Sequence, residues 1–169
     1  MNIIPWESEF PISRYLSEKA GSMGVPISWT FELTSRCNFN CKMCYVHEQK
    51  NKEDLKAREL SVSQWMDIAE EAKSQGLLFL LRTGGAAMIR EDFLELYREL
   101  SVMGFRVSIN TNGSLLSEET LECFRKYPPG RINVSLYGAS EDTYEDLCEV
   151  RAMGRVKKAI RELRQTGIP

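Results

Sequence analysis

The chain is poor in several features that commit a sequence to a particular class of protein. Its 169 residues include a single histidine, and 22 lysines and arginines nearly balance 24 aspartates and glutamates, which leaves a formal net charge of −2. No strong overall field therefore attracts nucleic acid or an anionic membrane surface. No apolar run approaches the roughly 20 residues of a membrane-spanning helix. The segment 1–7 lacks the basic stretch and the apolar core of a signal peptide.

Cysteine is present but unevenly placed. Three of the five cysteines fall within eight residues, which does not resemble the spread of cysteines in a secreted disulfide framework. We therefore expect a cytoplasmic, reducing setting, no membrane or nucleic-acid partner, and a metal site at the cluster. The length suffices for one domain with a sizeable core.

Strand-like and helix-like segments alternate along the sequence, which predicts βαβ units and an α/β fold with a parallel sheet. Glycine-bearing or polar turns follow most of the strand-like runs. The continuous apolar run 77–81 predicts a strand that is buried on both faces. The expected strands are 27–33, 77–81, 105–109 and 132–136, and the expected helices are 62–74, 91–103, 117–125, 140–148 and 156–165.

The rest of the chain divides simply. We expect an N-terminal extension over 1–26 with a short helix at 11–20, a core over 27–169, and an exposed, charge-rich loop over 47–59. Four parallel strands leave an open sheet edge, so self-association through that edge is an expectation. Apolar or small side chains expected in the core include Trp29, Phe31, Cys123 and Cys148.

The clustered cysteines are Cys37, Cys41 and Cys44, and they follow the first expected strand directly. In parallel α/β folds, ligands bind at the carboxyl ends of the strands, so this position suits a site. Iron–sulfur clusters are usually held by four thiolates. Three closely spaced thiolates would leave one iron open to a substrate or a cofactor.

A zinc site is the alternative that spacing alone leaves open. Together with His47, the three cysteines form a Cys₃His set, which is common in structural zinc sites. Three incidental thiols are a further alternative. At this level the residues favour a metal centre without deciding which metal it holds.

The order of motifs adds a resemblance. The Cys-x-x-x-Cys-x-x-Cys spacing after a first strand resembles that of the radical S-adenosylmethionine (SAM) superfamily, and 140–169 resembles the helical region of its SPASM-type and peptide-modifying members. The resemblance implies a parallel-stranded partial (βα) barrel, of which this chain would be the N-terminal portion, truncated to about four βα units. The further matching turns are Thr83-Gly84-Gly85, which resembles the start of the Gly-Gly-Glu-Pro motif, Thr111-Asn112-Gly113, and Val134 to Gly138.

The resemblance implies a radical SAM enzyme, and a module that holds the cluster without turnover is an alternative. Cys37, Cys41 and Cys44 would bind three irons of a 4Fe–4S cluster, and the fourth iron would bind the amino and carboxylate groups of SAM. An electron donor of the flavodoxin or ferredoxin type would reduce the cluster, and reductive cleavage of SAM would give a 5′-deoxyadenosyl radical that abstracts hydrogen from a substrate. That substrate would be a peptide or a protein. The cofactors supply the chemistry, so no side chain is singled out as catalytic.

The resemblance also implies residues that bind SAM. Met43, before the last cysteine of the motif, would contact adenine through its thioether, although simple packing is an alternative. Gly84 and Gly85 would let the backbone approach the ligand closely. The hydroxyls of Thr111 and Ser135 would bind the ribose or the methionine end, although ordinary strand-end hydroxyls are an alternative.

One departure from the family pattern concerns the second turn. Ala86 and Ala87 stand where the family has glutamate and proline. An alanine cannot accept a hydrogen bond from the ammonium group of SAM. Loss of such a charge-assisted bond costs roughly 1.5–3 kcal/mol, so we expect SAM binding that is weakened about tenfold to a hundredfold.

Overall fold

The computed structural model describes residues 11–46 and 52–168 of the chain. Its centre is a four-stranded parallel sheet in which the strands are adjacent in chain order, β1-β2-β3-β4. The prediction of an α/β fold with four parallel strands is therefore confirmed, and each strand lies within two residues of its expected bounds. The strands are β1 (Ser28–Glu32), β2 (Phe79–Thr83), β3 (Arg106–Thr111) and β4 (Arg131–Val134).

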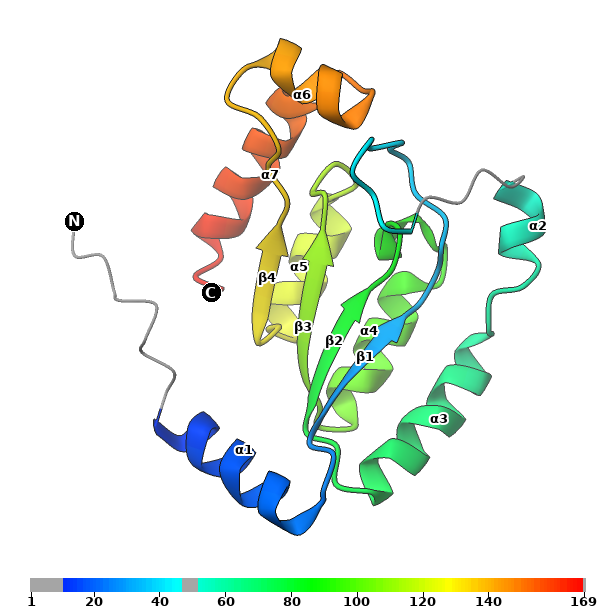
Figure 1. Ribbon diagram of the computed structural model, residues 1–169, viewed down its shortest axis with the longest axis vertical. Coiled ribbons are helices and arrows are strands. Elements are labelled where there is room, and N and C mark those ends of the chain that lie inside the picture. The colour runs from blue at the N-terminus through cyan, green and yellow to red at the C-terminus, as the bar shows by residue number, and fades with distance from the viewer. Residues whose placement is uncertain (1–10, 47–51, 169) are drawn as a thin grey trace.

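Helices connect the strands and gather on one face of the sheet. In Figure 1, α4 and α5 lie behind the sheet, with α3 and α7 to either side. Serine caps fix three of the starts, because Ser61, Ser117 and Ser140 each accept a hydrogen bond from the backbone three residues on, and Ser61 completes the expected capping box with Gln64. The helices are α1 (Pro11–Met23), α2 (Lys52–Lys56), α3 (Val62–Ser74), α4 (Phe93–Val102), α5 (Glu118–Lys126), α6 (Glu141–Cys148) and α7 (Met153–Gln165), with a short 3₁₀ turn η1 (Ala87–Ile89).

The main core lies between the sheet and the helices behind it. Side chains alternate across each strand, so Phe31, Leu80 and Ile109 point to the helices and are almost fully buried. Phe31 packs against Trp65 of α3 with ring centroids 4.9 Å apart. The expectation that Phe31 is a core residue is confirmed, and Trp29 packs against the same core while partly buried.

The opposite face of the sheet is more polar and more exposed. Thr30, Leu81, Ser108 and Arg131 lie in register across the four strands on this face. The prediction that the run 77–81 is buried on both faces is wrong for this chain, because Phe79 and Leu81, which point to this face, are only half-buried. The described part of the chain places no helix over this face (Figure 1), so the apolar run is covered on one side only.

A second correction concerns the expected exposed loop 47–59. Residues 47–51 lie outside the described residues, but 52–59 contain the helix α2, and Leu55 within it is buried. Glu59 is partly buried, since its carboxylate accepts hydrogen bonds from Arg36 and Thr34. Some of the charged residues in this stretch therefore form ion pairs with the rest of the fold, while others are exposed to solvent. Among the described residues, no helix is both long and apolar enough to cross a membrane.

Candidate metal and cofactor site

A cavity of about 350 Å³ opens at the carboxyl ends of the four strands. All eight residues that the sequence singles out as metal- or cofactor-binding line it, although they come from four separate segments of the chain. The juxtaposition follows from the topology, because parallel strands place the turns that follow them at one edge of the sheet. These residues are Cys37, Cys41, Met43, Cys44, Gly84, Gly85, Thr111 and Ser135.

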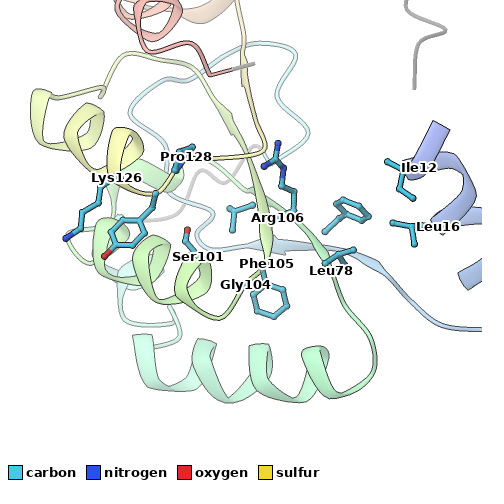
Figure 2. Close-up of a pocket in the computed structure, with 12 residues that line it drawn as sticks. Ile12, Leu16, Leu78, Ser101, Gly104, Phe105, Arg106, Lys126 and Pro128 are labelled. Carbon is cyan, nitrogen blue, oxygen red and sulfur yellow. The ribbon is translucent and has the colours of Figure 1, made fainter. Parts of the chain in front are cut away.

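A larger cavity, of about 590 Å³, lies at the opposite, amino-terminal edge of the sheet (Figure 2). Ile12 and Leu16 of α1 face Leu78 across it, and Arg106 and Lys126 are its charged residues. It contains no cysteine and no strand-end turn of the motifs. The motif cysteines and glycines line the smaller cavity, so we take that cavity as the candidate site. This choice agrees with the rule that ligands bind at the carboxyl ends of parallel strands.

The cysteines are arranged in a short loop, residues 37–44, which we call the cysteine loop. The backbone N–H of Cys44 donates to the carbonyl of Cys41 at 3.0 Å, and the N–H of Phe39 donates to the sulfur of Cys37 at 3.4 Å. Burial, with Cys148 next in effect, raises the pKa of the Cys41 thiol to about 12. This burial favours the neutral thiol of Cys41 over its thiolate.

The two candidate metal centres make different demands on the three sulfurs. Within residues 11–46 and 52–168, no three Cys, His, Asp or Glu side chains come together closely enough to hold one metal ion. A zinc ion needs every sulfur ligand at about 2.3 Å. In a 4Fe–4S cluster each thiolate binds a different iron, so the sulfurs lie further apart around a shared space. The three cysteines line one cavity, and His47, the fourth residue of the zinc alternative, lies outside the described residues.

The cysteine loop is docked against α6, a contact that the sequence did not predict. The backbone N–H of Lys42 donates to the carbonyl of Leu147 at 2.9 Å, and the ring of Phe39 meets that of Tyr144 edge to face at 6.4 Å. Cys148, at the end of α6, is fully buried and packs in one apolar cluster with Phe39 and Cys41. The expectation that Cys148 is a core residue is confirmed, and its place is directly behind the cysteine loop.

Polar contacts reinforce this docking at its edge. Lys42 forms an ion pair with Asp146 at 2.6 Å, and the amide of Asn40 donates to the carboxylate of Glu149. Glu149 is the C-cap of α6 and adopts a left-handed conformation, with φ of 55°. Glycine or asparagine usually occupies such a position. The side chain of Glu149 reaches the cysteine loop from this left-handed position.

A second anchor holds the start of the cysteine loop from the other side. Arg36 precedes the first cysteine, and its guanidinium donates to both carboxylate oxygens of Glu59, at 2.7 and 2.9 Å. Arg90 is almost fully buried, lies 3.5 Å from Glu59, and donates to the carbonyl of Leu33 at 3.0 Å. Asp92 completes the network through two further bonds from Arg90. This ion-pair network fixes the end of β1 relative to α3 and α4.

Gly84 and Gly85 are required by the backbone that lies beside them. Gly84 has φ of +119°, and a Cβ there would lie 2.3 Å from the carbonyl oxygen of Thr34. A Cβ at Gly85 would lie 2.2 Å from the carbonyl oxygen of Arg36. The N–H of Gly85 donates to Thr34 and that of Ala86 donates to Arg36, both at 2.8 Å. The glycine pair therefore packs the second turn onto the strand that leads into the cysteine loop.

The remaining residues of the site are neutral. Met43 is 46 % exposed at the rim of the cavity, near Tyr45 and Tyr137, which are also exposed. The hydroxyl of Thr111 accepts from the N–H of Gly113 at 3.0 Å, which is the ordinary strand-end role.

Ala86 and Ala87 are buried and do not line the cavity. Three asparagines that the sequence did not single out, Asn110, Asn112 and Asn133, also line the wall of the cavity.

This chain belongs to the radical SAM superfamily, whose family model matches residues 31–169. It is 31% identical over 137 residues to a probable GTP 3′,8-cyclase of Sulfurisphaera tokodaii, in an alignment that covers 80% of this chain and 42% of that protein. It is 32% identical over 144 residues to an AdoMet-dependent heme synthase of Methanosarcina barkeri, covering 85% and 40%. The resemblance read from the motifs is confirmed, and the zinc alternative is not favoured.

Solved structures show the same fold. SuiB of Streptococcus suis matches with a TM-score of 0.73 at 19% identity, over 93% of this chain and 35% of that one. A structure of SuiB bound to S-adenosylmethionine matches with a TM-score of 0.70, at 20% identity, over 93% and 36%. The structure of anSMEcpe with bound AdoMet and Cp18Cys peptide gives 0.66, at 16% identity, over 85% and 41%. This chain therefore spans about two fifths of the length of the proteins that it matches.

Proposed function

We propose that the cavity at the strand ends binds a 4Fe–4S cluster and SAM, and that the chain is a radical SAM catalytic domain. The observation that carries the proposal is the meeting of the three motif cysteines with both glycines of the second turn in one cavity. When bound, the cluster and SAM supply the electron and the 5′-deoxyadenosyl radical that abstracts hydrogen from a substrate. The protein binds and orients them.

In this proposal the three cysteines would hold three irons, and the fourth iron would bind the amino and carboxylate groups of SAM. The cavity wall supports this assignment, because none of the described residues that line it is charged. Among those residues, the wall therefore offers no charged side chain of its own to the amino and carboxylate groups of SAM. Neutral amides and hydroxyls, such as those of Asn133 and Ser135, suit the hydroxyl groups of a ribose. Met43, half-exposed at the rim, suits the face of an adenine ring.

A peptide or protein is the substrate class that the site supports best. The structure of SuiB bound to its precursor peptide SuiA has a TM-score of 0.68 to this chain at 21% identity, and anSMEcpe was solved with a peptide. In this chain Tyr45 and Tyr137 are 77 % and 42 % exposed beside the cavity. Exposed aromatic side chains at a cavity mouth are typical of a surface that binds a partner.

We also propose an electron donor and a cellular setting for the reaction. A low-potential donor of the flavodoxin or ferredoxin type would reduce the cluster. The five cysteines of the structure are free thiols, which supports a reducing, cytoplasmic setting. The open edge of the sheet at β4 remains a proposed surface for self-association.

The test is anaerobic reconstitution of the chain with iron and sulfide. We expect about four irons and four sulfides per chain, a brown sample that bleaches with dithionite, and formation of 5′-deoxyadenosine from SAM. Cys44→Ser should abolish both iron uptake and SAM cleavage. Cys123→Ser is the matched control, because Cys123 lies on α5 against the main core and does not line the cavity.

Two results would contradict the proposal. The first is a colourless sample that takes up one zinc and no iron. The second is iron uptake that Cys44→Ser and Cys123→Ser affect equally. The peptide assignment is tested separately with a substrate deuterated at candidate positions, since transfer of deuterium into 5′-deoxyadenosine identifies the hydrogen that is abstracted.

A further inference from the structure

Asn112 follows β3 at the carboxyl edge of the sheet, and its side-chain amide is held in one orientation. Its carbonyl oxygen Oδ1 accepts hydrogen bonds from the backbone N–H of Ser114 at 3.0 Å and from the Ser114 hydroxyl at 2.8 Å. A backbone N–H can only donate, so the oxygen must face Ser114. The amide nitrogen Nδ2 must therefore face the other way.

The amide nitrogen of Asn112 faces the cysteine loop. It lies 3.0 Å from Oδ1 of Asn38 and 3.9 Å from the sulfur of Cys37. The amide of Asn38 donates in turn to the hydroxyl of Ser114 at 2.7 Å. The side chains of Asn112, Asn38 and Ser114 thus form a closed network. The second N–H of the Asn112 amide is directed at Cys37, the first cysteine of the motif.

Cys37 receives a second donor from within the loop. The backbone N–H of Phe39 lies 3.4 Å from the same sulfur. A thiolate that binds iron carries more negative charge when the cluster is reduced, so N–H groups directed at it favour the reduced state. Hydrogen bonds to the sulfurs are among the features that set the reduction potential of such clusters.

We infer that Asn112 is a positioning residue that raises the reduction potential of the cluster through an N–H···S hydrogen bond to Cys37. The inference rests on the proposed function, because it requires a cluster on the cysteine loop. Asn112 lies 75 positions from Cys37 in the sequence, so the turn after β3 acts on the first iron ligand across the sheet edge. In this role Asn112 makes electron transfer from the donor more favourable.

The test is a redox titration of the reconstituted protein without SAM, followed by EPR of the reduced cluster. Asn112→Leu keeps the approximate volume and removes the amide. We expect the equilibrium constant for reduction to fall about tenfold, which is a shift of about 59 mV to lower potential for one electron. Asn133→Leu is the matched control, because Asn133 lines the same cavity but donates to Asn110 at 2.8 Å instead of to a sulfur.

The outcomes separate the inference from the proposed function. If the unsubstituted chain takes up no iron and sulfide, the proposed function fails. If it takes up the cluster and the two leucine variants have the same potential, the inference alone is overturned.

A second variant covers loss of folding in Asn112→Leu. Asn112→Asp retains the acceptor for Ser114 and removes the N–H. Resonance Raman bands of the iron–cysteine bonds shift on exchange into D₂O when an exchangeable N–H is bonded to the sulfur. We expect that isotope shift to be smaller in Asn112→Asp than in the unsubstituted protein, and an equal shift in both overturns the inference.

Discussion

The guanidinium of Arg82 lies 4.6 Å from the centre of the Phe93 ring, deep in the main core. Arg82 has no exposed surface, and within the part of the chain that the structure describes none of its three guanidinium nitrogens has a hydrogen-bond partner. Burial lowers its pKa to about 9. The cation–π contacts with Phe93 and Tyr97 offset only part of the cost of burying a charge.

Arg82→Met should therefore stabilise the fold. Methionine has a similar length and adapts to an irregular site, so we expect the free energy of unfolding to rise by about 1–4 kcal/mol. Denaturant unfolding followed by circular dichroism measures the change. Arg98→Met on the exposed side of α4 is the control and should stay within about 0.5 kcal/mol. A clear loss of stability in Arg82→Met would show that the buried charge has a partner.

Glu59→Gln should destabilise the fold and loosen the start of the cysteine loop. The substitution leaves Arg36 and the buried Arg90 without their shared anion. Because the pair is nearly buried, we expect a loss of about 2–4 kcal/mol in the free energy of unfolding. The exposed pair of Glu118 with Arg125 provides the control, since Glu118→Gln should cost less than about 1 kcal/mol. Equal losses in both variants would refute the anchoring role.

The same network predicts how stability depends on pH. Burial raises the pKa of Glu59, but hydrogen bonds from Arg36 and Thr34 outweigh burial and hold it below the ordinary value of 4.5. Bonds from Arg90 likewise hold the pKa of Asp92 below 3.8. The unfolded chain therefore binds more protons in acid, so this contribution is complete above about pH 4.5 and is lost as pH falls through the folded pKa values.

Thermal unfolding of the metal-free chain between pH 6 and pH 3 measures this dependence. We expect the loss of stability below about pH 4.5 to be smaller in Glu59→Gln than in the unsubstituted chain, because the variant no longer gains a proton at this position. Parallel curves would show that other carboxylates dominate the acid transition.

Glu149→Gly should separate stability from the order of the cysteine loop. Glycine accepts the left-handed conformation freely, which relieves a cost of about 1–2 kcal/mol, but it removes the contact with Asn40. We expect unchanged or higher global stability together with faster hydrogen exchange in residues 38–44. Asn40→Ala removes the same contact without relieving strain, so it should show faster exchange and lower stability. Unaltered exchange in both variants would exclude the contact as a restraint on the loop.

Ala86 lies behind the cavity wall, so Ala86→Glu tests whether a longer side chain at this position reaches SAM. A charge-assisted hydrogen bond from there to the ammonium group should tighten SAM binding by about tenfold to a hundredfold. Ala86 is 4 % exposed, and its N–H already bonds to the carbonyl of Arg36. Calorimetric titration of SAM into the reconstituted protein measures the affinity. Ala86→Gln, which has the same length without the charge, should gain less. No gain from glutamate would remove this role for position 86.

The sequence predicted well those features that depend on local pattern and on chain order. Apolar runs and serine caps located the four strands and most of the helices, and the rule for parallel strands brought Cys37, Gly84, Thr111 and Ser135 to one cavity. The predictions of burial were wrong where a residue is covered by segments that are distant in the sequence. The charged stretch that contains Glu59 was expected in solvent, but it holds α2 and the anchor of Arg36.

The contacts that position the cysteine loop could not be predicted for the same reason. Asn40 meets Glu149 from 109 positions away, and Lys42 meets Asp146 from 104. Asparagine and lysine are usually exposed, so the residue type alone does not show that either side chain makes such a contact. Asn112 belonged to a turn that the sequence had already marked, yet its direction toward Cys37 depends on the bonds that Ser114 makes.

The close packing of Gly84 and Gly85 against Thr34 and Arg36 has a consequence for the design of inhibitors and variants. A methyl group added at either glycine would displace neighbouring backbone before it reached a bound nucleoside. Substitutions there will therefore report on damage to the adjoining chain, and affinity lost in such variants should not be attributed to direct contact with the adenosyl moiety.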